Sequence, residues 1–256
     1  MLSTKKAVGE QTELLEEVVA IARRAATPVL EIYESDFRVR AKEDASPVTD
    51  ADERAHGVIV EALGVLTPDV PVISEEGPKP DPCGRFWLVD PLDGTKEFAG
   101  RIGEFTINIA LVEDGRPTVG VVLAPAVDRL FAGAPGVAFT EGSSARSTMA
   151  CRCTPPEGMT VLTSRSHNAD DPMKKFLEGR RVARVLSAGS SLKFCLIACG
   201  EADLYPRLGR TMEWDTAAGH AVLAAAGGRV TTLNGAELRY GKPGLANPAF
   251  IAYGSG

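Results

Sequence analysis

The spacing of hydrophobic positions changes along the chain, from helical at the start to strand-like in the middle. Between Glu10 and Tyr33, apolar residues recur every three or four positions, which predicts an amphipathic helix with Thr12 as a candidate N-cap. A second helix is expected from about Asp50 to Leu66. A short extended segment from Pro68 to Ile73 then leads into the acidic turn Ser74-Glu-Glu76. The beginning of the chain is therefore predicted to be mostly helical.

Runs of apolar and aromatic residues predict a series of strands in the middle of the chain. Residues 86–89 are typical of a buried strand, which should end at Asp90-Pro91. Further strands are expected at residues 105–112 and 117–123, joined through the hairpin signal Glu113-Asp-Gly-Arg116, and at residues 130–132 and 137–140. These strands form an antiparallel series.

In the last part of the chain, strands and helices alternate. Strands are expected at residues 160–163, 183–186, 202–205 and 229–232, and helices at residues 171–179, 190–199 and 215–226. The change of pattern predicts a mixed α/β (α+β) protein in two lobes, with the border near residues 145–158. We take residues 1–150 as an α+β lobe and residues 151–256 as an α/β lobe.

The composition is that of an ordinary globular protein, with 44% hydrophobic and 24% charged residues in 256. No apolar run approaches the roughly 18 residues of a membrane span, and the first residues lack the apolar core of a signal peptide. We therefore expect a cytoplasmic protein, and peripheral contact with the inner membrane would be compatible with the sequence. The net charge of −6, without a block of Lys or Arg, argues against a nucleic acid polymer as partner. The sequence indicates no stable protein partner.

Carboxylates mark the candidate site. The strand at 86–89 delivers Asp90 at its C-terminal end, where α/β proteins bind ligands, and Asp93 returns a second carboxylate to the same place. Gly94-Thr95 then opens a short helix whose free N–H groups could bind an anion such as phosphate. Glu75 and Asp215 could complete the site, and hard divalent ions such as Mg²⁺ suit oxygen ligands of this kind.

Each acidic motif also has a purely structural explanation. Asp90 and Asp93 could form an Asx-turn before a capped helix, and Glu75-Glu76 could be a solvated turn. Asp215 could be the N-cap of an Ala-rich helix, worth about 1 kcal/mol. The three motifs together are far more specific than any one of them.

Asp90-Pro-Leu-Asp-Gly-Thr95 matches the D-P-[IL]-D-G-T signature of the inositol monophosphatase superfamily. Three further segments resemble the other acidic motifs of this superfamily in the same order, namely Val48-Thr-Asp-Ala-Asp52, Ser74-Glu-Glu76 and Trp214-Asp215. The resemblance extends from about Glu13 to Tyr253. It implies the layered αβαβα sandwich of that superfamily and a metal-dependent phosphatase that lithium inhibits.

The residues around the motifs narrow the resemblance. The segments Lys96-Glu97-Phe98, Gly103–Leu111, Ser164–His167, Gly189–Cys195 and Leu204–Arg207 resemble the bacterial branch of 3′(2′),5′-bisphosphate nucleotidases. This branch removes the 3′-phosphate of adenosine 3′,5′-bisphosphate and so clears a nucleotide by-product of sulfate assimilation. Two alternatives stay open: an inositol-1-phosphate or fructose-1,6-bisphosphate phosphatase with the same metal site, and a non-catalytic nucleotide or metal sensor.

The resemblance also implies roles for individual residues. Two or three Mg²⁺ ions would be held by the side chains of Glu75, Asp90, Asp93 and Asp215 and by the carbonyl of Leu92. The first lobe would carry most of these ligands, and the second would close the substrate site. Asp52 and Thr95 would orient and deprotonate the attacking water, although Asp50 leaves open which carboxylate faces that water. Asp93 would be a third catalytic residue. No covalent phosphoenzyme is expected.

The expected partner is a small nucleotide bisphosphate, and its contacts would come from both lobes. The reacting phosphate would meet Glu75, Leu92, Asp93, Gly94, Thr95 and Asp215. Lys193 and Arg207 are the natural partners of a second phosphate, because arginine forms a bidentate fork. Ser190 and His167 could contact phosphate, ribose or base. The structural alternative for these four is an ordinary solvated surface or loop position.

Overall fold

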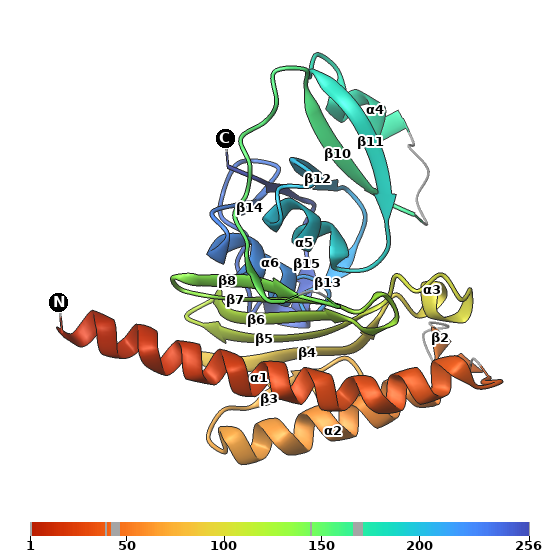
Figure 1. Ribbon diagram of the computed structural model, residues 1–256, viewed down its shortest axis with the longest axis vertical. Helices are drawn as coiled ribbons and strands as arrows, with labels where there is room; N and C mark the ends of the chain where they lie inside the picture. The colour runs from red at the N-terminus through yellow and green to blue at the C-terminus, as the bar shows by residue number, and fades with distance from the viewer. Residues whose placement is uncertain (1, 39, 42–46, 144, 166–170, 256) are drawn as a thin grey trace.

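The chain folds into five layers of alternating helices and sheets (Figure 1). The computed structural model describes residues 2–38, 40–41, 47–143, 145–165 and 171–255. Its helices are α1 (Leu2–Glu34), α2 (Asp50–Leu66), α3 (Thr95–Ala99), α4 (Asp171–Leu177), α5 (Leu192–Ala198) and α6 (Ala217–Ala225). Two 3₁₀ turns, η1 (Pro125–Val127) and η2 (Pro243–Leu245), accompany them.

The larger sheet has seven strands whose spatial order follows the chain. They are β3 (Val72–Ser74), β4 (Arg85–Asp93), β5 (Thr106–Glu113), β6 (Arg116–Ala124), β7 (Arg129–Ala134), β8 (Val137–Glu141) and β9 (Ser147–Thr148). All neighbours are antiparallel except β3 and β4, which run parallel. Because these two strands run parallel, their C-terminal ends lie at the same edge of the sheet.

The smaller sheet has five strands in the order β11-β10-β12-β16-β14. They are β10 (Met159–Ser164), β11 (Val182–Ala188), β12 (Leu204–Arg207), β14 (Arg229–Thr232) and β16 (Phe250–Tyr253). Two short pairs complete the fold, β1 (Arg40–Ala41) with β2 (Pro47–Val48) and β13 (Thr211–Met212) with β15 (Ala246–Asn247).

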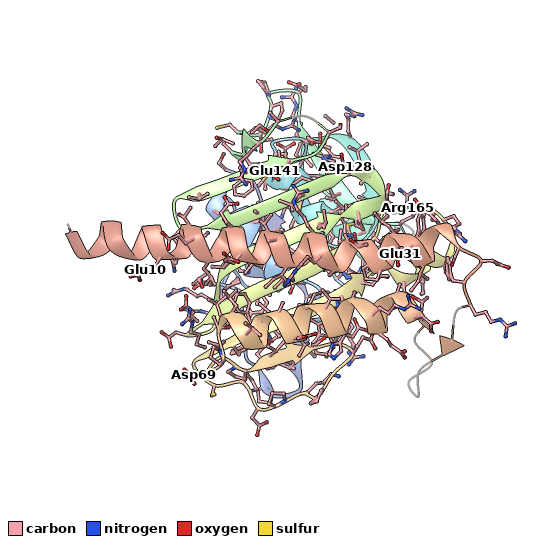
Figure 2. The ribbon with its side chains drawn as sticks, turned by 60° about the horizontal axis from the view of Figure 1, so that its bottom comes forward. Glu10, Glu31, Asp69, Asp128, Glu141 and Arg165 are labelled. Carbon is pink, nitrogen blue, oxygen red and sulfur yellow. The ribbon has the colours of Figure 1, made fainter. Side chains whose placement is uncertain are left out.

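The larger sheet is buried on both faces, which explains why its central strands are almost continuously apolar. On one face, Trp87 and Val89 of β4 pack into the core under α1 and α2. On the other, Phe86 and Leu88 pack into the core shared with α5 and α6. Figure 2 shows α1 and α2 side by side across the sheet, with Glu10 and Glu31 towards opposite ends of α1.

The smaller sheet covers α5 and α6 from the other side, and α4 forms the last layer. Phe176 and Leu177 of α4 pack against Val161 and Leu204 on the outer face of that sheet. The order is therefore α1/α2, large sheet, α5/α6, small sheet, α4, and the predicted αβαβα sandwich is confirmed. All strands of the larger sheet precede residue 149, and those of the smaller sheet follow residue 158. The division into lobes 1–150 and 151–256 remains our interpretation, because one apolar core combines residues from both.

Several sequence-based boundaries are wrong. Helix α1 begins at Leu2 and runs through Thr12, so Thr12 is not an N-cap; residues 2–11 contain no proline that would stop the helix. Strand β4 does not end at Asp90-Pro91 but continues to Asp93, with a shift of register between Asp90 and Asp93. Such a bulge tolerates proline, which cannot donate to a regular ladder. Strand β16, which lies between β12 and β14 in the smaller sheet, was not predicted.

Candidate active site

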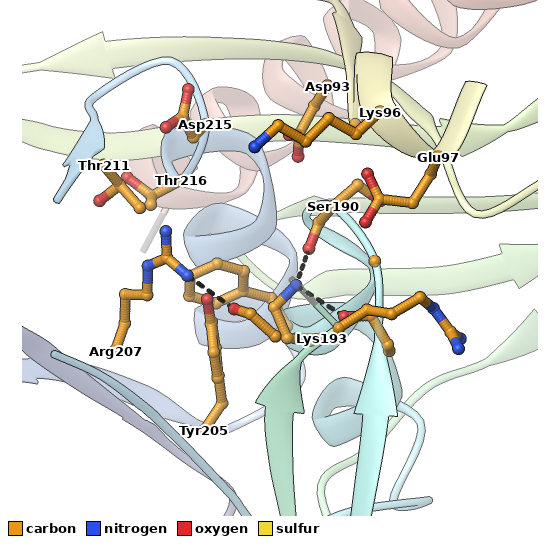
Figure 3. Close-up of a pocket in the computed structure, with 16 residues that line it drawn as sticks. Asp93, Lys96, Glu97, Ser190, Lys193, Tyr205, Arg207, Thr211, Asp215 and Thr216 are labelled. Carbon is orange, nitrogen blue, oxygen red and sulfur yellow. Dashed lines mark hydrogen bonds between the residues drawn. The ribbon is translucent and has the colours of Figure 1, made fainter. Parts of the chain in front are cut away.

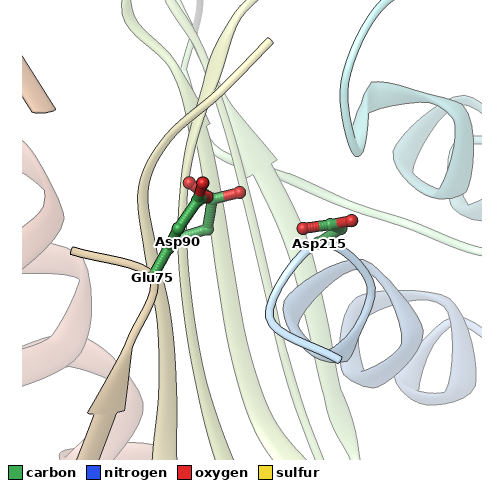
Figure 4. Close-up of side chains that lie close together, drawn as sticks. All are labelled: Glu75, Asp90 and Asp215. Carbon is green, nitrogen blue, oxygen red and sulfur yellow. The ribbon is translucent and has the colours of Figure 1, made fainter. Parts of the chain in front are cut away.

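Three carboxylates from distant parts of the sequence meet at one place. Oxygen atoms of Glu75, Asp90 and Asp215 lie within 4.8 Å of one another (Figure 4). Glu75 follows β3, and its backbone N–H donates to the carbonyl of Val89 at 3.0 Å, which extends the parallel pairing with β4. This pairing sets Glu75 beside Asp90. Asp215 arrives from the residues just before α6.

The acidic cluster is electrostatically unfavourable without a cation. Asp90 is only 2% exposed, and burial, followed by repulsion from Glu75 and Asp93, raises its pKa well above the usual range. Burial and the charge of Asp93 likewise raise the pKa of Asp215 to about 8. Crowded buried carboxylates are stable as anions when they coordinate a metal. An all-oxygen donor set of this kind fits a hard divalent ion.

Local turns hold two of these carboxylates. Asp90 Oδ1 accepts a hydrogen bond from the Leu92 N–H at 3.1 Å. Asp90 therefore forms the predicted Asx-turn and also belongs to the acidic cluster. Asp215 Oδ2 accepts from the Met212 N–H at 2.8 Å. The N-cap position of α6 belongs to Thr216, so Asp215 is not the helix cap. Both side chains are fixed by backbone donors next to the cluster.

Asp93 lies beside the cluster but is not one of its three members. Its Oδ2 is 3.5 Å from Asn108 Nδ2, and it lines the cavity described below. Burial raises its pKa to about 6, although the charge of Lys193 opposes that rise. Asp93 therefore lies between the acidic cluster and the ammonium group of Lys193.

Glu213, two residues before Asp215, is a fully buried carboxylate that was not among the predicted site residues. Its carboxylate accepts from the N–H groups of Gly241 (2.6 Å) and Lys242 (3.0 Å) and pairs with the Lys242 ammonium. The carbonyl of Glu213 accepts from Ala217 N–H at 3.0 Å. Glu213 thus ties the start of α6, and with it Asp215, to the loop at residues 241–242.

Asp52 serves as an anchor at the start of α2. Its Oδ2 accepts from the N–H (2.8 Å) and the Oγ1 (2.7 Å) of Thr49, and Thr49 Oγ1 accepts from Ala51 N–H, which is a capping box. Burial raises the pKa of Asp52 to about 6. Thr95 Oγ1 lies 3.4 Å from the carbonyl oxygen of Leu92. Among the described residues, no hydrogen bond joins Asp52 to Thr95.

A cavity adjoins the acidic cluster and is lined from both halves of the chain (Figure 3). Its volume is about 210 Å³, and it is partly open to solvent. Asp93, Asp215 and Lys96 line one side in Figure 3, and Lys193, Tyr205 and Arg207 the other. We call the side with Asp93, Asp215 and the adjoining carboxylates Glu75 and Asp90 the acidic end, although Lys96 also lies there, and the side with Lys193 and Arg207 the cationic end.

Two buried polar atoms at the cationic end have no hydrogen-bond partner among the described residues. They are Ser190 Oγ and Arg207 Nε. The remaining guanidinium nitrogens of Arg207 donate to Ser164 Oγ (2.6 Å) and to the Arg210 carbonyl (3.1 Å). Both residues line the cavity, and because buried polar groups are nearly always paired, we expect a water or a ligand to pair with these two atoms.

Lys193 is only 4% exposed and projects from α5 into the same cavity. Its ammonium donates to the carbonyls of Ala188 (3.1 Å) and Ser190 (2.5 Å), which leaves one of its three N–H groups unused by them. Burial lowers its pKa to about 8, against the opposing effect of Asp93. The solvated alternative is therefore wrong for Lys193.

Gly189 allows the second lobe to approach the first at this point. A Cβ placed on Gly189 would lie 2.6 Å from the Glu104 carbonyl oxygen and 3.0 Å from Glu97 Cγ, so a larger residue would not fit. The Gly189 N–H donates to Glu104 Oε2 at 2.7 Å, and the same carboxylate binds Arg165. The structure thus brings Ser190, Lys193 and Arg207 together as the sequence suggested. His167 lies outside the described residues.

The fold and the site define a class of protein. The model of the inositol monophosphatase family matches residues 10–253, and the chain belongs to this family. An Escherichia coli (strain K12) protein named 3′(2′),5′-bisphosphate nucleotidase CysQ is 47% identical over 248 residues, which cover 93% of this chain and 98% of the relative.

Solved structures agree with this assignment. The crystal structure of CysQ from Bacteroides thetaiotaomicron, described as a bacterial member of the inositol monophosphatase family, has a TM-score of 0.82 at 35% identity and covers 95% of this chain and 98% of its own. An inositol monophosphatase from Thermotoga maritima has a TM-score of 0.78 at 26% identity, covering 94% and 92%. In the described part of the chain, we find no helix with the length and hydropathy that crossing a membrane requires.

Proposed function

We propose that the chain is a metal-dependent 3′(2′),5′-bisphosphate nucleotidase, which hydrolyses the 3′-phosphate of adenosine 3′,5′-bisphosphate to give AMP and phosphate, in the cytoplasm. The observation that carries the proposal is the two-ended cavity, since a carboxylate cluster at one end and buried cations at the other suit a substrate with two phosphates. The relatives named 3′(2′),5′-bisphosphate nucleotidase, at 46–47% identity, support it.

The acidic end would hold the metal ions. We assign two or three Mg²⁺ to the side chains of Glu75, Asp90, Asp93 and Asp215 and to the carbonyl oxygen of Leu92. Bound there, Mg²⁺ would lower the pKa of a water and stabilise charge on the leaving ribose oxygen. The raised pKa values of Asp90 and Asp215 support this assignment, because such groups gain most from a cation.

The residues around the reacting phosphate would position it and the attacking water. Gly94 has a φ of 89°, a left-handed conformation that favours glycine, and it turns the chain from β4 into α3. We infer that the N–H groups of Gly94 and Thr95 hold the transferred phosphoryl group. Asp52 and the Thr95 hydroxyl, with Asp93, would orient the water and take its proton.

The cationic end would bind the phosphate that does not react. Arg207 Nε and Ser190 Oγ are buried donors without partners among the described residues, and Lys193 has an unused N–H. A 5′-phosphate offers the acceptor oxygens that these three donors require. We assign His167 to the same nucleotide on sequence grounds.

The test is phosphate release by the purified protein in Mg²⁺, with kcat/KM compared for adenosine 3′,5′-bisphosphate, inositol-1-phosphate and fructose-1,6-bisphosphate. We expect a strong preference for the nucleotide. A preference for the inositol or sugar phosphate would keep the metal site but contradict the assigned substrate. No release from any of them would favour a non-catalytic nucleotide or metal sensor.

A further inference from the structure

Glu97 is a carboxylate in the cavity that neither metal binding nor the second phosphate requires. It belongs to α3, is 7% exposed and lines the cavity. Figure 3 shows its carboxylate turned from α3 into the cavity on the side of Ser190. The two other carboxylates that line the cavity are Asp93 and Asp215, at the acidic end. Glu97 is therefore available for a different task.

The carboxylate of Glu97 has unused capacity to accept hydrogen bonds. Among the described residues, none donates one to it. Two neighbouring cations are engaged elsewhere: Arg165 donates to Glu104 at 2.6 and 3.2 Å, and Lys193 donates to two backbone carbonyls. A third, Lys96, also lines the cavity, and Figure 3 shows its ammonium pointing away from Glu97 toward Asp215. An ionised carboxylate can only accept. The group that faces Glu97 in a complex must therefore be a donor.

Glu97 lies near the reacting end of the cavity. A Cβ placed on Gly94 would be 3.4 Å from Glu97 Oε2, so the carboxylate sits directly beside the turn that leads into α3. A Cβ placed on Gly189, next to Ser190, would in turn be 3.0 Å from Glu97 Cγ. A substrate donor that meets the carboxylate therefore lies between the two phosphate sites, next to the Gly94 turn. In a nucleoside 3′-phosphate that donor is the 2′-hydroxyl, on the carbon next to the one that carries the phosphate. The amino group of the base is much farther from that phosphate.

We propose that Glu97 is a specificity-determining residue that accepts a hydrogen bond from the free ribose hydroxyl next to the reacting phosphate. This inference rests on the proposed nucleotidase function. A site that pairs a buried carboxylate with a hydroxyl rejects an analogue lacking that hydroxyl, because the carboxylate is then left unpaired. The enzyme should therefore discriminate ribonucleotides from 2′-deoxyribonucleotides.

The test is a cycle of two proteins and two substrates. The wild type and Glu97→Ala are assayed in Mg²⁺ with adenosine 3′,5′-bisphosphate and its 2′-deoxy analogue. For the wild type, kcat/KM should be on the order of 10–100-fold higher for the ribonucleotide. Glu97→Ala should lose this preference, mainly by losing activity on the ribonucleotide. Glu97→Gln keeps an acceptor oxygen without the charge and should lie between the two.

Controls separate this role from a structural one. Glu157→Ala removes an exposed carboxylate outside the cavity and should retain the wild-type preference. An equal loss on both substrates in Glu97→Ala would mean that Glu97 only supports the fold or the charge of Lys193, and would overturn the proposal. Should that variant fail to fold, the wild type with the 2′-O-methyl analogue decides, since unchanged kcat/KM overturns the proposal.

The two proposals fail in different ways. A wild type that hydrolyses both nucleotides equally well leaves the nucleotidase function intact and overturns the role of Glu97. A wild type that hydrolyses neither nucleotide overturns both.

Discussion

The two ends of the cavity are built on opposite electrostatic principles. At the acidic end, Glu75, Asp90 and Asp215 crowd their oxygens within 4.8 Å and repel one another. At the cationic end, Lys193 and Arg207 are already hydrogen-bonded to protein oxygens and keep only part of their donor capacity free. The acidic end is stable in its fully ionised form only with an external cation, whereas the cationic end is preorganised by the fold.

This difference has a consequence for mutations. Neutralising an acidic residue relieves repulsion while it removes a metal ligand, so stability and activity should move in opposite directions. Replacing Lys193 or Arg207 by an uncharged residue removes hydrogen bonds that are already formed in the free protein. The loss of activity should chiefly concern substrates that carry a second phosphate. The four predictions below are ordered by the size of the expected effect on catalysis.

Asp90→Asn should have the largest effect. Loss of a buried metal ligand should lower kcat/KM on the order of 10³-fold, because charge on the leaving oxygen is no longer stabilised. Without metal, the melting temperature should rise, since Asp90 is repelled by Glu75, Asp93 and Asp215. Phosphate release and thermal unfolding in EDTA measure the two effects. Near-normal turnover at unchanged Mg²⁺ affinity would remove Asp90 from the metal site.

Arg207→Ala should weaken the cationic end selectively. For adenosine 3′,5′-bisphosphate, kcat/KM should fall on the order of 100-fold, because a buried charged partner of phosphate is lost. For adenosine 3′-monophosphate, which lacks the 5′-phosphate, the change should be small. Arg210→Ala is the matched control. Arg207 donates to the backbone carbonyl of Arg210, and this substitution leaves that carbonyl in place. Equal losses on both substrates would place Arg207 away from the second phosphate.

Glu213→Gln should act on the acidic end from a distance. Lys242 loses its buried counter-charge, and the anchor between residues 241–242 and the start of α6 weakens. The Mg²⁺ concentration for half-maximal activity should rise on the order of tenfold, as is usual when support behind a metal ligand is removed. Glu237→Gln, which breaks an exposed pair with Arg116, serves as the control. An unchanged Mg²⁺ requirement would show that Asp215 does not depend on this anchor.

The smallest expected effect is a pH dependence at Lys193. Its pKa, lowered to about 8 by burial, means that its charge is present below pH 8 and is lost as the pH rises through that value. The ratio of KM for the bisphosphate to KM for adenosine 3′-monophosphate should therefore increase above pH 8, by up to about tenfold. Lys193→Met should abolish the increase. A ratio that stays flat in the wild type would contradict a charged contact from Lys193.

The sequence predicted the site best where a few consecutive residues determine the position of a functional side chain. The spacing of Asp90 and Asp93, the turn after β3 and the residues before α6 were all recognisable, and three of the four expected carboxylates form one cluster. The periodicity also predicted most helices and strands. It missed β16 because four residues of a buried strand near the end of the chain have no distinctive pattern, and it placed the end of β4 too early because Pro91 lies in a bulge.

The sequence by itself determined the class of chemistry, since acidic motifs in a fixed order and a glycine that can turn β4 into α3 are properties of short segments. Only the tertiary structure decided which polar groups share the cavity. Burial of Glu97 and Glu213, the unpaired donors on Ser190 and Arg207, and the close approach at Gly189 all depend on how the second sheet and α5 pack against the first lobe. Burial and hydrogen bonding are set by residues far apart in the chain, and no local pattern records them.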